Sequence, residues 1–190
     1  MDADGVTFAC ATAAELRAAR RTGARAALVG LGARTAVPEG PLVSFGLAGA
    51  LRDDLPVGTV LDVTRVVDTE GVVLWSGEGL GVSRQGTILA AETIVDDPDE
   101  RRRLHERTGA DAADLESGPL ARTGRLRGVL RAVSDTPTRP LNGLVGGVTA
   151  DGSYNWPGLV KAFARSPRAF VRSASDARHA LRQLMRSCAA

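Results

Sequence analysis

Residues 6–30, VTFACATAAELRAARRTGARAALVG, decide the fold class of this chain. Val6–Ala11 is apolar without alternation, which is typical of a short strand buried on both faces. Thr12–Glu15 has the Thr-x-x-Glu form of a capping box and predicts the start of a helix that continues over Leu16–Arg21. Arg25–Gly30 predicts a second buried strand. A strand, a helix and a strand in this order indicate an α/β fold.

The same alternation continues along the chain. Strands are predicted at Leu42–Ala48, Thr59–Val67, Val72–Trp75, Thr87–Ala91, Ala110–Leu115 and Val129–Ser134. Helices are predicted from Asp97 to about Arg107, over Glu116–Arg122, and from Ser166 onwards. This pattern predicts a three-layer α/β/α sandwich with a central mixed sheet. A length of 190 residues fits one domain spanning residues 1–190.

Composition excludes several classes of protein. Lys and Arg number 24 against 22 Asp and Glu, which is too balanced for a protein held mainly by nucleic-acid phosphates. Aromatic residues make up only 4%, so a platform that stacks bases is not expected. Two Cys and two His leave almost no ligands for a Cys/His metal site, and we expect neither a metal nor a cofactor.

The N-terminus and the hydropathy pattern predict a cytoplasmic protein. Asp2 and Asp4 make the N-terminus acidic, unlike a secretory signal, and no apolar stretch approaches the roughly 20 residues of a membrane span. Cys10 and Cys188 lie at opposite ends of the chain and make no disulfide framework. We therefore expect a reduced cytoplasmic setting and no membrane span.

Four segments with candidate binding residues lie at the carboxyl ends of predicted strands, where open α/β sheets bind their ligands. Glu15 is locally best interpreted as the capping partner of the Thr before it, with a ligand contact as the alternative. Phe45–Ala50 (FGLAGA) either makes a tight turn or brings backbone N–H groups close to a ligand. Asp114–Ser117 either caps a helix or binds sugar hydroxyls. Arg131–Asp135 ends either in a turn carboxylate or in a proton donor whose pKa is raised by desolvation.

Other motifs in the sequence do not support a specific binding site. Gly30-Leu31-Gly32 is half of a dinucleotide fingerprint, without its third Gly. Arg101–Arg103 is interpreted as a solvated helix face rather than a nucleic-acid patch. The sequence contains neither a GxxxxGK[ST] phosphate loop nor a GxSxG motif.

Taken together and in this order, these four segments resemble the nucleoside phosphorylase/nucleosidase superfamily, which includes purine nucleoside phosphorylases and methylthioadenosine/S-adenosylhomocysteine nucleosidases. VSFGLAGALRDDLPVGTVL at Val43–Leu61 is similar to the family's strand, its Gly-Ala-Gly turn and the stretch that follows. ADLESGPLA at Ala113–Ala121 resembles its ribose motif, and LRAVSDTP at Leu130–Pro137 resembles its catalytic strand. The tail Asp151–Leu184 and the opening ACATAAELRAAR at residues 9–20 are similar to the branch linked to hopanoid biosynthesis, which removes adenine from an adenosylated triterpenoid.

The resemblance implies a role for each matching residue. Asp135 would be the general acid that protonates a purine ring nitrogen, with Arg131 and Ser134 as orienting residues. Glu116 would accept hydrogen bonds from the ribose hydroxyls and favour an oxocarbenium-like transition state. Glu15 would position and deprotonate the attacking water, which overrides the purely local capping interpretation.

The substrate-binding turn would consist of Gly46, Leu47, Ala48 and Gly49, with Leu115 at the position of a Met that packs against the ribose. Methylthioadenosine nucleosidases have a Ser where this chain has Leu47, which favours a bulky apolar 5′ substituent. The phosphate-binding loop of bacterial purine phosphorylases has no clear counterpart, and the connection between Gly32 and Pro41 is shorter than in the family.

The resulting hypothesis is a homodimeric nucleosidase that releases adenine from a 5′-substituted, adenosine-type nucleoside. The alternatives are a phosphorylase that forms ribose 1-phosphate, and a catalytically inactive nucleoside-binding protein of the same fold.

Overall fold

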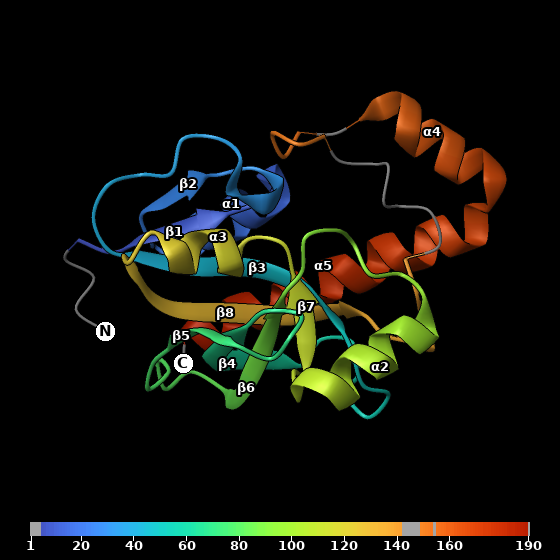
Figure 1. The fold of residues 1–190 in the computed structure, drawn as a ribbon. Coiled ribbons are helices and arrows are strands. Elements are labelled where there is room, and N and C mark those ends of the chain that lie inside the picture. The colour runs from blue at the N-terminus through green and yellow to red at the C-terminus, as the bar shows by residue number, and fades with distance from the viewer. Residues whose placement is uncertain (1–4, 142–148, 154, 190) are drawn as a thin grey trace.

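The computed structural model describes residues 5–141, 149–153 and 155–189. The strands within them are β1 (Thr7–Cys10), β2 (Ala26–Leu28), β3 (Leu42–Ala50), β4 (Val60–Val67), β5 (Val73–Ser76), β6 (Arg84–Ala90), β7 (Ala112–Asp114) and β8 (Leu126–Asp135). The helices are α1 (Ala13–Arg21), α2 (Pro98–Thr108), α3 (Ser117–Arg122), α4 (Trp156–Arg165) and α5 (Pro167–Ala189), and Leu31–Ala33 form a 3₁₀ turn. Strands and helices alternate from β1 to β2 and again from β6 to β8 (Figure 1), which confirms the α/β prediction, whereas β3 to β6 follow one another without a helix between them.

One mixed sheet joins these strands. β1 lies between β2 and β3 and is parallel to both. β3 pairs with β8 in parallel, and its last residues, Gly49 and Ala50, pair with β7 in the antiparallel direction. β7 continues to β6, β6 to β4, and β4 back to β8, while β5 pairs with β4. The five strands β3, β7, β6, β4 and β8 therefore form a closed ring.

This ring corrects the predicted three-layer sandwich, although the mixed sheet itself is confirmed. The ring closes because one edge of β3 pairs with β8 along most of the length of β3. Its other edge pairs with β1 over the first half of β3 and with β7 at the end of β3. A register shift between Ala48 and Gly49 marks the place where β3 changes neighbours. Long strands twist, and a twisted sheet with enough strands closes on itself rather than staying a flat layer.

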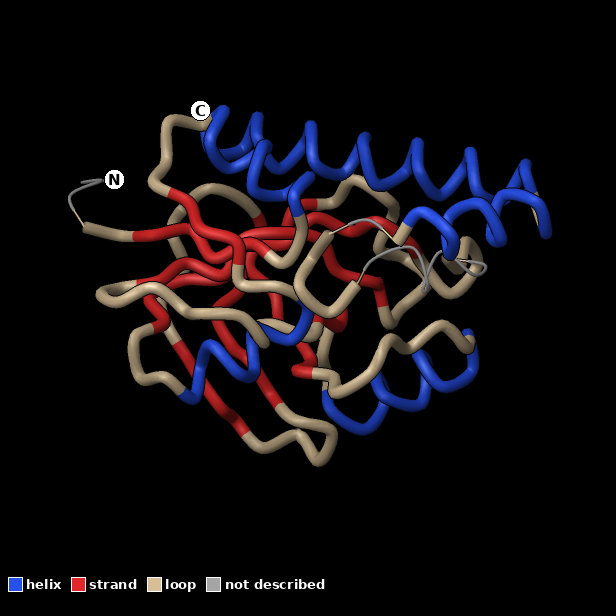
Figure 2. The backbone as a smooth tube through the Cα atoms, turned by 90° about the horizontal axis from the view of Figure 1, so that it is seen from above, coloured by secondary structure: helices blue, strands red, loops and turns tan. Residues whose placement is uncertain are grey.

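Two apolar clusters lie on either side of the paired strands β3 and β8. α5 covers these strands on one side, where Ala180, Leu181 and Leu184 join Phe45 and Leu130. Figure 2 shows α5 running along one side of the molecule. The other cluster fills the strand ring and includes Leu120 of α3. These two clusters hold β3 and β8, and with them the residues at their carboxyl-terminal ends, in fixed positions.

α4 lies beyond the sheet, next to the first turns of α5 (Figure 1). In the part of the chain that the structure describes, no helix is both long and apolar enough to span a bilayer.

Candidate active site

A cavity of about 190 Å³ lies at the edge of the sheet where the parallel strands β1, β3 and β8 end. All four segments predicted from the sequence contribute to its wall. The residues concerned are Thr12 and Glu15 after β1, Leu47, Ala48 and Gly49 of β3, Asp114, Leu115 and Glu116 after β7, and Ser134 and Asp135 at the end of β8. The sheet thus brings together carboxylates that are up to 120 residues apart in the sequence.

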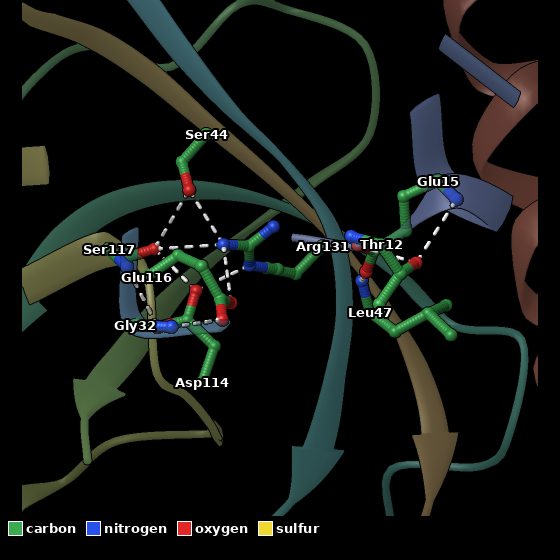
Figure 3. Close-up of polar contacts among 9 residues, drawn as sticks. All are labelled: Thr12, Glu15, Gly32, Ser44, Leu47, Asp114, Glu116, Ser117 and Arg131. Carbon is green, nitrogen blue, oxygen red and sulfur yellow. Dashed lines mark hydrogen bonds and ion pairs between the residues drawn. The ribbon is translucent and has the colours of Figure 1, made fainter. Parts of the chain in front are cut away.

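Glu15 uses its two carboxylate oxygens for different purposes (Figure 3). Oε2 accepts hydrogen bonds from the backbone N–H of Thr12 at 2.8 Å and from its hydroxyl at 3.0 Å, so the predicted capping box is present. Oε1 accepts a hydrogen bond from the backbone N–H of Leu47 at 2.8 Å. Burial raises the pKa of Glu15, while Arg131 and these hydrogen bonds act in the opposite direction. Glu15 therefore caps α1 and also reaches the cavity.

Gly46 does not line the cavity but makes the approach of Glu15 possible. A Cβ atom at this position would lie 2.3 Å from Glu15 Oε1 and 2.9 Å from Arg131 Nη1. Neither side chain could then keep its place, because carbon and oxygen atoms do not approach that closely without a bond. Gly46 lies within strand β3 rather than in a turn, and its lack of a side chain lets Glu15 and Arg131 come together across this strand.

Arg131 lies behind the cavity wall and does not contact Asp135. Its guanidinium forms an ion pair with Asp114, donates to the Ser44 hydroxyl at 2.6 Å, and lies 3.6 Å from Glu116 Oε2 (Figure 3). The predicted role of Arg131 beside the general acid therefore does not match its place in the structure. A fully buried cation between Asp114, Glu116 and Glu15 instead stabilises these carboxylates in the absence of solvent.

Glu116 faces the cavity from the turn between β7 and α3. Its Oε1 accepts a hydrogen bond from the backbone N–H of Gly32 at 3.0 Å, and the side chain is almost completely buried. Burial and the nearby Asp114 carboxylate raise the pKa of Glu116 to about 8, against the opposing effect of Arg131. The raised pKa favours the protonated carboxyl group, which can donate a hydrogen bond to a sugar hydroxyl, whereas the ionised form can only accept one.

Replacement of Glu116 by Gln should flatten a pH dependence of stability. The pKa of Glu116 rises from 4.5 to about 8 on folding, so in this range the folded chain holds the proton more tightly than the unfolded chain. The free energy of unfolding therefore falls as the pH rises through this range. Denaturant unfolding at several pH values should show a smaller fall for Glu116→Gln than for the wild type. Equal slopes for the two proteins would contradict the raised pKa.

Asp135 is held between Ser134 and Arg101, and the sequence had predicted a solvated helix face for Arg101. Its Oδ1 accepts a hydrogen bond from the Ser134 hydroxyl at 2.6 Å, and its Oδ2 forms an ion pair with Arg101. Burial raises the pKa of Asp135, and Arg101 opposes that rise. A Cβ atom on Gly49 would lie 2.8 Å from Asp135 Oδ2, so this Gly leaves the space that the carboxylate occupies.

Arg101 corrects the prediction of a solvated Arg101–Arg103 face. Only 1% of Arg101 is exposed, whereas Arg102 and Arg103 pair with acids at the surface. Arg101 donates to the backbone carbonyls of Val95 at 2.9 Å and Ala50 at 3.2 Å, in addition to its ion pair with Asp135. It lies three residues before the buried Leu104 and so on the same face of α2, which is the signal that could have identified it.

The remaining wall of the cavity is largely apolar. It includes Leu31, Leu47, Leu51, Ile94, Val95, Leu115 and Leu141. Within residues 5–141, 149–153 and 155–189, no group of three or more His, Cys, Asp or Glu side chains is arranged to hold a metal ion. The arrangement is that of a small-molecule pocket, mostly apolar with a few convergent polar groups.

Comparison with known proteins gives matches among solved structures, while no protein family and no curated protein matches the chain. The 5′-methylthioadenosine/S-adenosylhomocysteine nucleosidase of Helicobacter pylori superposes with a TM-score of 0.64 at 13% identity, over 96% of each chain. The same enzyme from Campylobacter jejuni gives 0.61 at 14% identity, over 97% of this chain and 98% of that one. Futalosine hydrolase of Helicobacter pylori gives 0.60 at 13% identity, over 94% and 96%. This chain has the fold of these nucleosidases.

The shared fold is not confined to one part of the chain. It extends over nearly the whole length of both chains in each comparison. The short connection between Gly32 and Pro41 therefore does not prevent the fold from forming. Gly32 at its start instead binds Glu116 through its backbone N–H, a contact that no local sequence pattern indicated.

Proposed function

We propose that this protein is a nucleosidase that hydrolyses the N-glycosidic bond of an adenosine-type nucleoside carrying a 5′ substituent. The observation that carries the proposal is the convergence of Glu15, Glu116 and Asp135 on one cavity. All three carboxyl groups are buried, and burial raises the pKa of each. Groups of this kind in one pocket are suited to acid–base chemistry near neutral pH.

Each carboxyl group has a separate task in the proposed reaction. Asp135, oriented by Ser134, delivers a proton to a ring nitrogen of the purine, so that the base leaves as a neutral molecule. Glu116 binds the ribose hydroxyls and stabilises the positive charge that develops on the sugar. Glu15 takes a proton from the attacking water. Because Leu47 N–H and Thr12 fix the Glu15 carboxylate, it needs little reorganisation when the reaction occurs.

The 5′ substituent is proposed to be apolar. Leu47, Leu115 and Leu141 line the cavity, and a buried apolar surface contributes about 25 cal/mol per Å². The cavity volume of about 190 Å³ is also below the roughly 300 Å³ at which small-molecule pockets usually begin, so a substituted nucleoside must extend beyond it. A long apolar group, such as the triterpenoid of the hopanoid-linked branch, is the substituent that the sequence resemblance favours.

Hydrolysis is favoured over phosphorolysis by the charges around the cavity. Arg101 is the Arg that lines the cavity among the described residues, and each of its three nitrogens already donates a hydrogen bond, to Asp135 or to a backbone carbonyl. Arg34 lines a different hollow, together with Arg122. The Glu15 carboxylate would repel a phosphate dianion, while it suits a water molecule.

The inactive binding protein is disfavoured by the same carboxyl groups. Burial of ionisable groups costs free energy, and a protein that only binds nucleosides would gain nothing from three of them around one pocket. We also propose a homodimer, on the resemblance to the nucleosidases and the small size of the chain.

The proposed substrate class is tested with a panel of nucleosides, followed by chromatography of the released base. Adenosine derivatives with apolar 5′ substituents of increasing length should release adenine with rising kcat/KM. Inosine and guanosine should be poor substrates. A strict preference for unmodified inosine or guanosine would contradict the proposal.

A further inference from the structure

One face of α5 carries only basic and neutral side chains. The buried residues Ser173, Ala180, Leu181 and Leu184 lie on one side of this helix. The opposite side, an arc of about 120° at 3.6 residues per turn, presents Arg168, Val171, Arg172, Arg178, Arg182 and Arg186, all of them exposed. Asp176, the one acid of α5, lies off this arc and pairs with Arg139.

α1 extends this basic face. Arg17 and Arg21 of α1 line a shallow hollow between the two helices together with Arg178 and Arg182 of α5. Within the described part of the chain, none of these four guanidinium groups has a carboxylate partner. α1, α4 and α5 together contain ten of the 24 Lys and Arg residues but only two of the 22 Asp and Glu residues, one of which is the buried Glu15. Positive charge is therefore concentrated on this side of a nearly neutral chain.

Apolar side chains are exposed at the end of α5 that packs against α4. Val160 and Phe163 of α4 and Val171 of α5 are 65%, 48% and 59% exposed. Phe163 packs edge-on against Phe170 with ring centroids 5.6 Å apart, which connects the two helices. Lys161 and Arg165 accompany these residues on α4, which contains no acid. The end of the molecule formed by α4 and the first turns of α5 is thus both apolar and basic.

We propose that the face formed by α1, α4 and α5 docks on the surface of an anionic lipid bilayer. Basic side chains along an amphipathic helix are attracted to anionic headgroups, and exposed apolar residues enter the boundary with the acyl chains. A nucleic acid would meet the Arg residues but would leave Val160 and Val171 in water. Two copies of the face would repel each other, because neither carries the acids that the other needs. This inference is independent of the proposed enzymatic activity.

The test is sedimentation of the full chain with vesicles, in the absence of any nucleoside. The protein should bind vesicles of mixed phosphatidylcholine and phosphatidylglycerol about tenfold or more tightly than vesicles of phosphatidylcholine alone. High salt should weaken this binding, since screening shortens the reach of the charges. Equal binding to both kinds of vesicle, or no binding to either, would overturn the proposal.

Two pairs of variants locate the surface. Arg178→Glu with Arg182→Glu, and separately Val160→Glu with Phe163→Glu, should each reduce vesicle binding about tenfold or more. The matched controls are Arg65→Glu with Arg84→Glu on β4 and β6, and Val72→Glu with Val73→Glu at the start of β5, all of them at exposed residues. The controls should bind vesicles more tightly than the corresponding variants. Equal losses in variants and controls would place the contact elsewhere.

Two other outcomes would assign the face to another partner. One is tight binding of an oligonucleotide without vesicle binding, and the other is self-association that the variants abolish.

Discussion

Asp135→Asn should reduce kcat/KM for the release of adenine by roughly 10²–10⁴-fold, the usual contribution of a general acid. The amide cannot supply a proton to the purine, while it keeps the shape of the carboxyl group and can still accept the hydrogen bond from Ser134. Initial rates of adenine formation under saturating and limiting substrate give kcat and kcat/KM separately. The loss should appear in kcat, because proton transfer occurs in the transition state.

Asp96→Asn is a suitable control for the loss of charge. Asp96 Oδ1 lies 3.8 Å from Arg101 Nη2, yet Asp96 lies outside the wall of the cavity. This variant should keep most of the wild-type turnover. Similar losses in the two variants would mean that Asp135 acts only by holding Arg101, and wild-type activity in Asp135→Asn would remove it from the mechanism.

Glu15→Gln should also reduce kcat by roughly 10²–10⁴-fold, because the amide cannot accept a proton from the attacking water. The capping box accepts Gln as well as Glu at this position, so a Gln whose amide oxygen faces Thr12 should keep the helix start, while its NH2 group leaves the Leu47 N–H without this acceptor. The melting temperature should therefore fall only by the loss of one hydrogen bond, while turnover is lost. This combination separates catalysis from capping, which sequence analysis alone left open.

The opposite combination would assign Glu15 to α1 alone. A variant with normal kcat and a lowered melting temperature would show that its carboxylate serves the capping box and the Leu47 N–H only. Thr12→Ala is a useful companion, because the loss of an N-cap side chain costs about 0.5–2 kcal/mol of stability. Its effect on kcat should be far smaller than that of Glu15→Gln.

Local signals in the sequence predicted the elements with their caps. The Thr12-x-x-Glu15 spacing predicted the capping box, and Asp97 before Pro98 predicted the start of α2, both as observed. These features depend on hydrogen bonds within four residues, so the local sequence determines them. The boundaries were less accurate: β6 begins at Arg84 rather than Thr87, and β8 at Leu126 rather than Val129.

The closure of the strand ring could not be predicted in the same way. It depends on β8 pairing with β3 on one side and with β4 on the other, and both contacts join distant parts of the chain. A buried strand that is apolar throughout looks the same in a flat layer and in a closed ring. The pattern therefore predicted the mixed sheet but not its curvature.

The residues that line the cavity could be predicted where motifs are continuous in sequence, and were missed where the contacts join distant residues. Glu15, Glu116 and Asp135 lie in short motifs, and the structure brings them to one cavity. Arg101 comes from a run of three Arg whose members look alike, although only one of them turns toward the core. Arg131 lies in the expected motif, but its guanidinium reaches Asp114 and Ser44 rather than Asp135. The partners that the long Arg131 side chain reaches are distant in sequence, so they are decided by the packing of the whole fold and not by the local motif.

The hydrolysis of an adenosine-type nucleoside is tested most directly by adenine release with and without inorganic phosphate. The purified protein is incubated with a 5′-substituted adenosine in phosphate-free buffer, and the base and the sugar are both followed by chromatography. We expect release of adenine with free sugar as the second product, at a rate that added phosphate does not increase. Turnover that requires phosphate and yields a sugar 1-phosphate, or no turnover on any adenosine derivative, would contradict it.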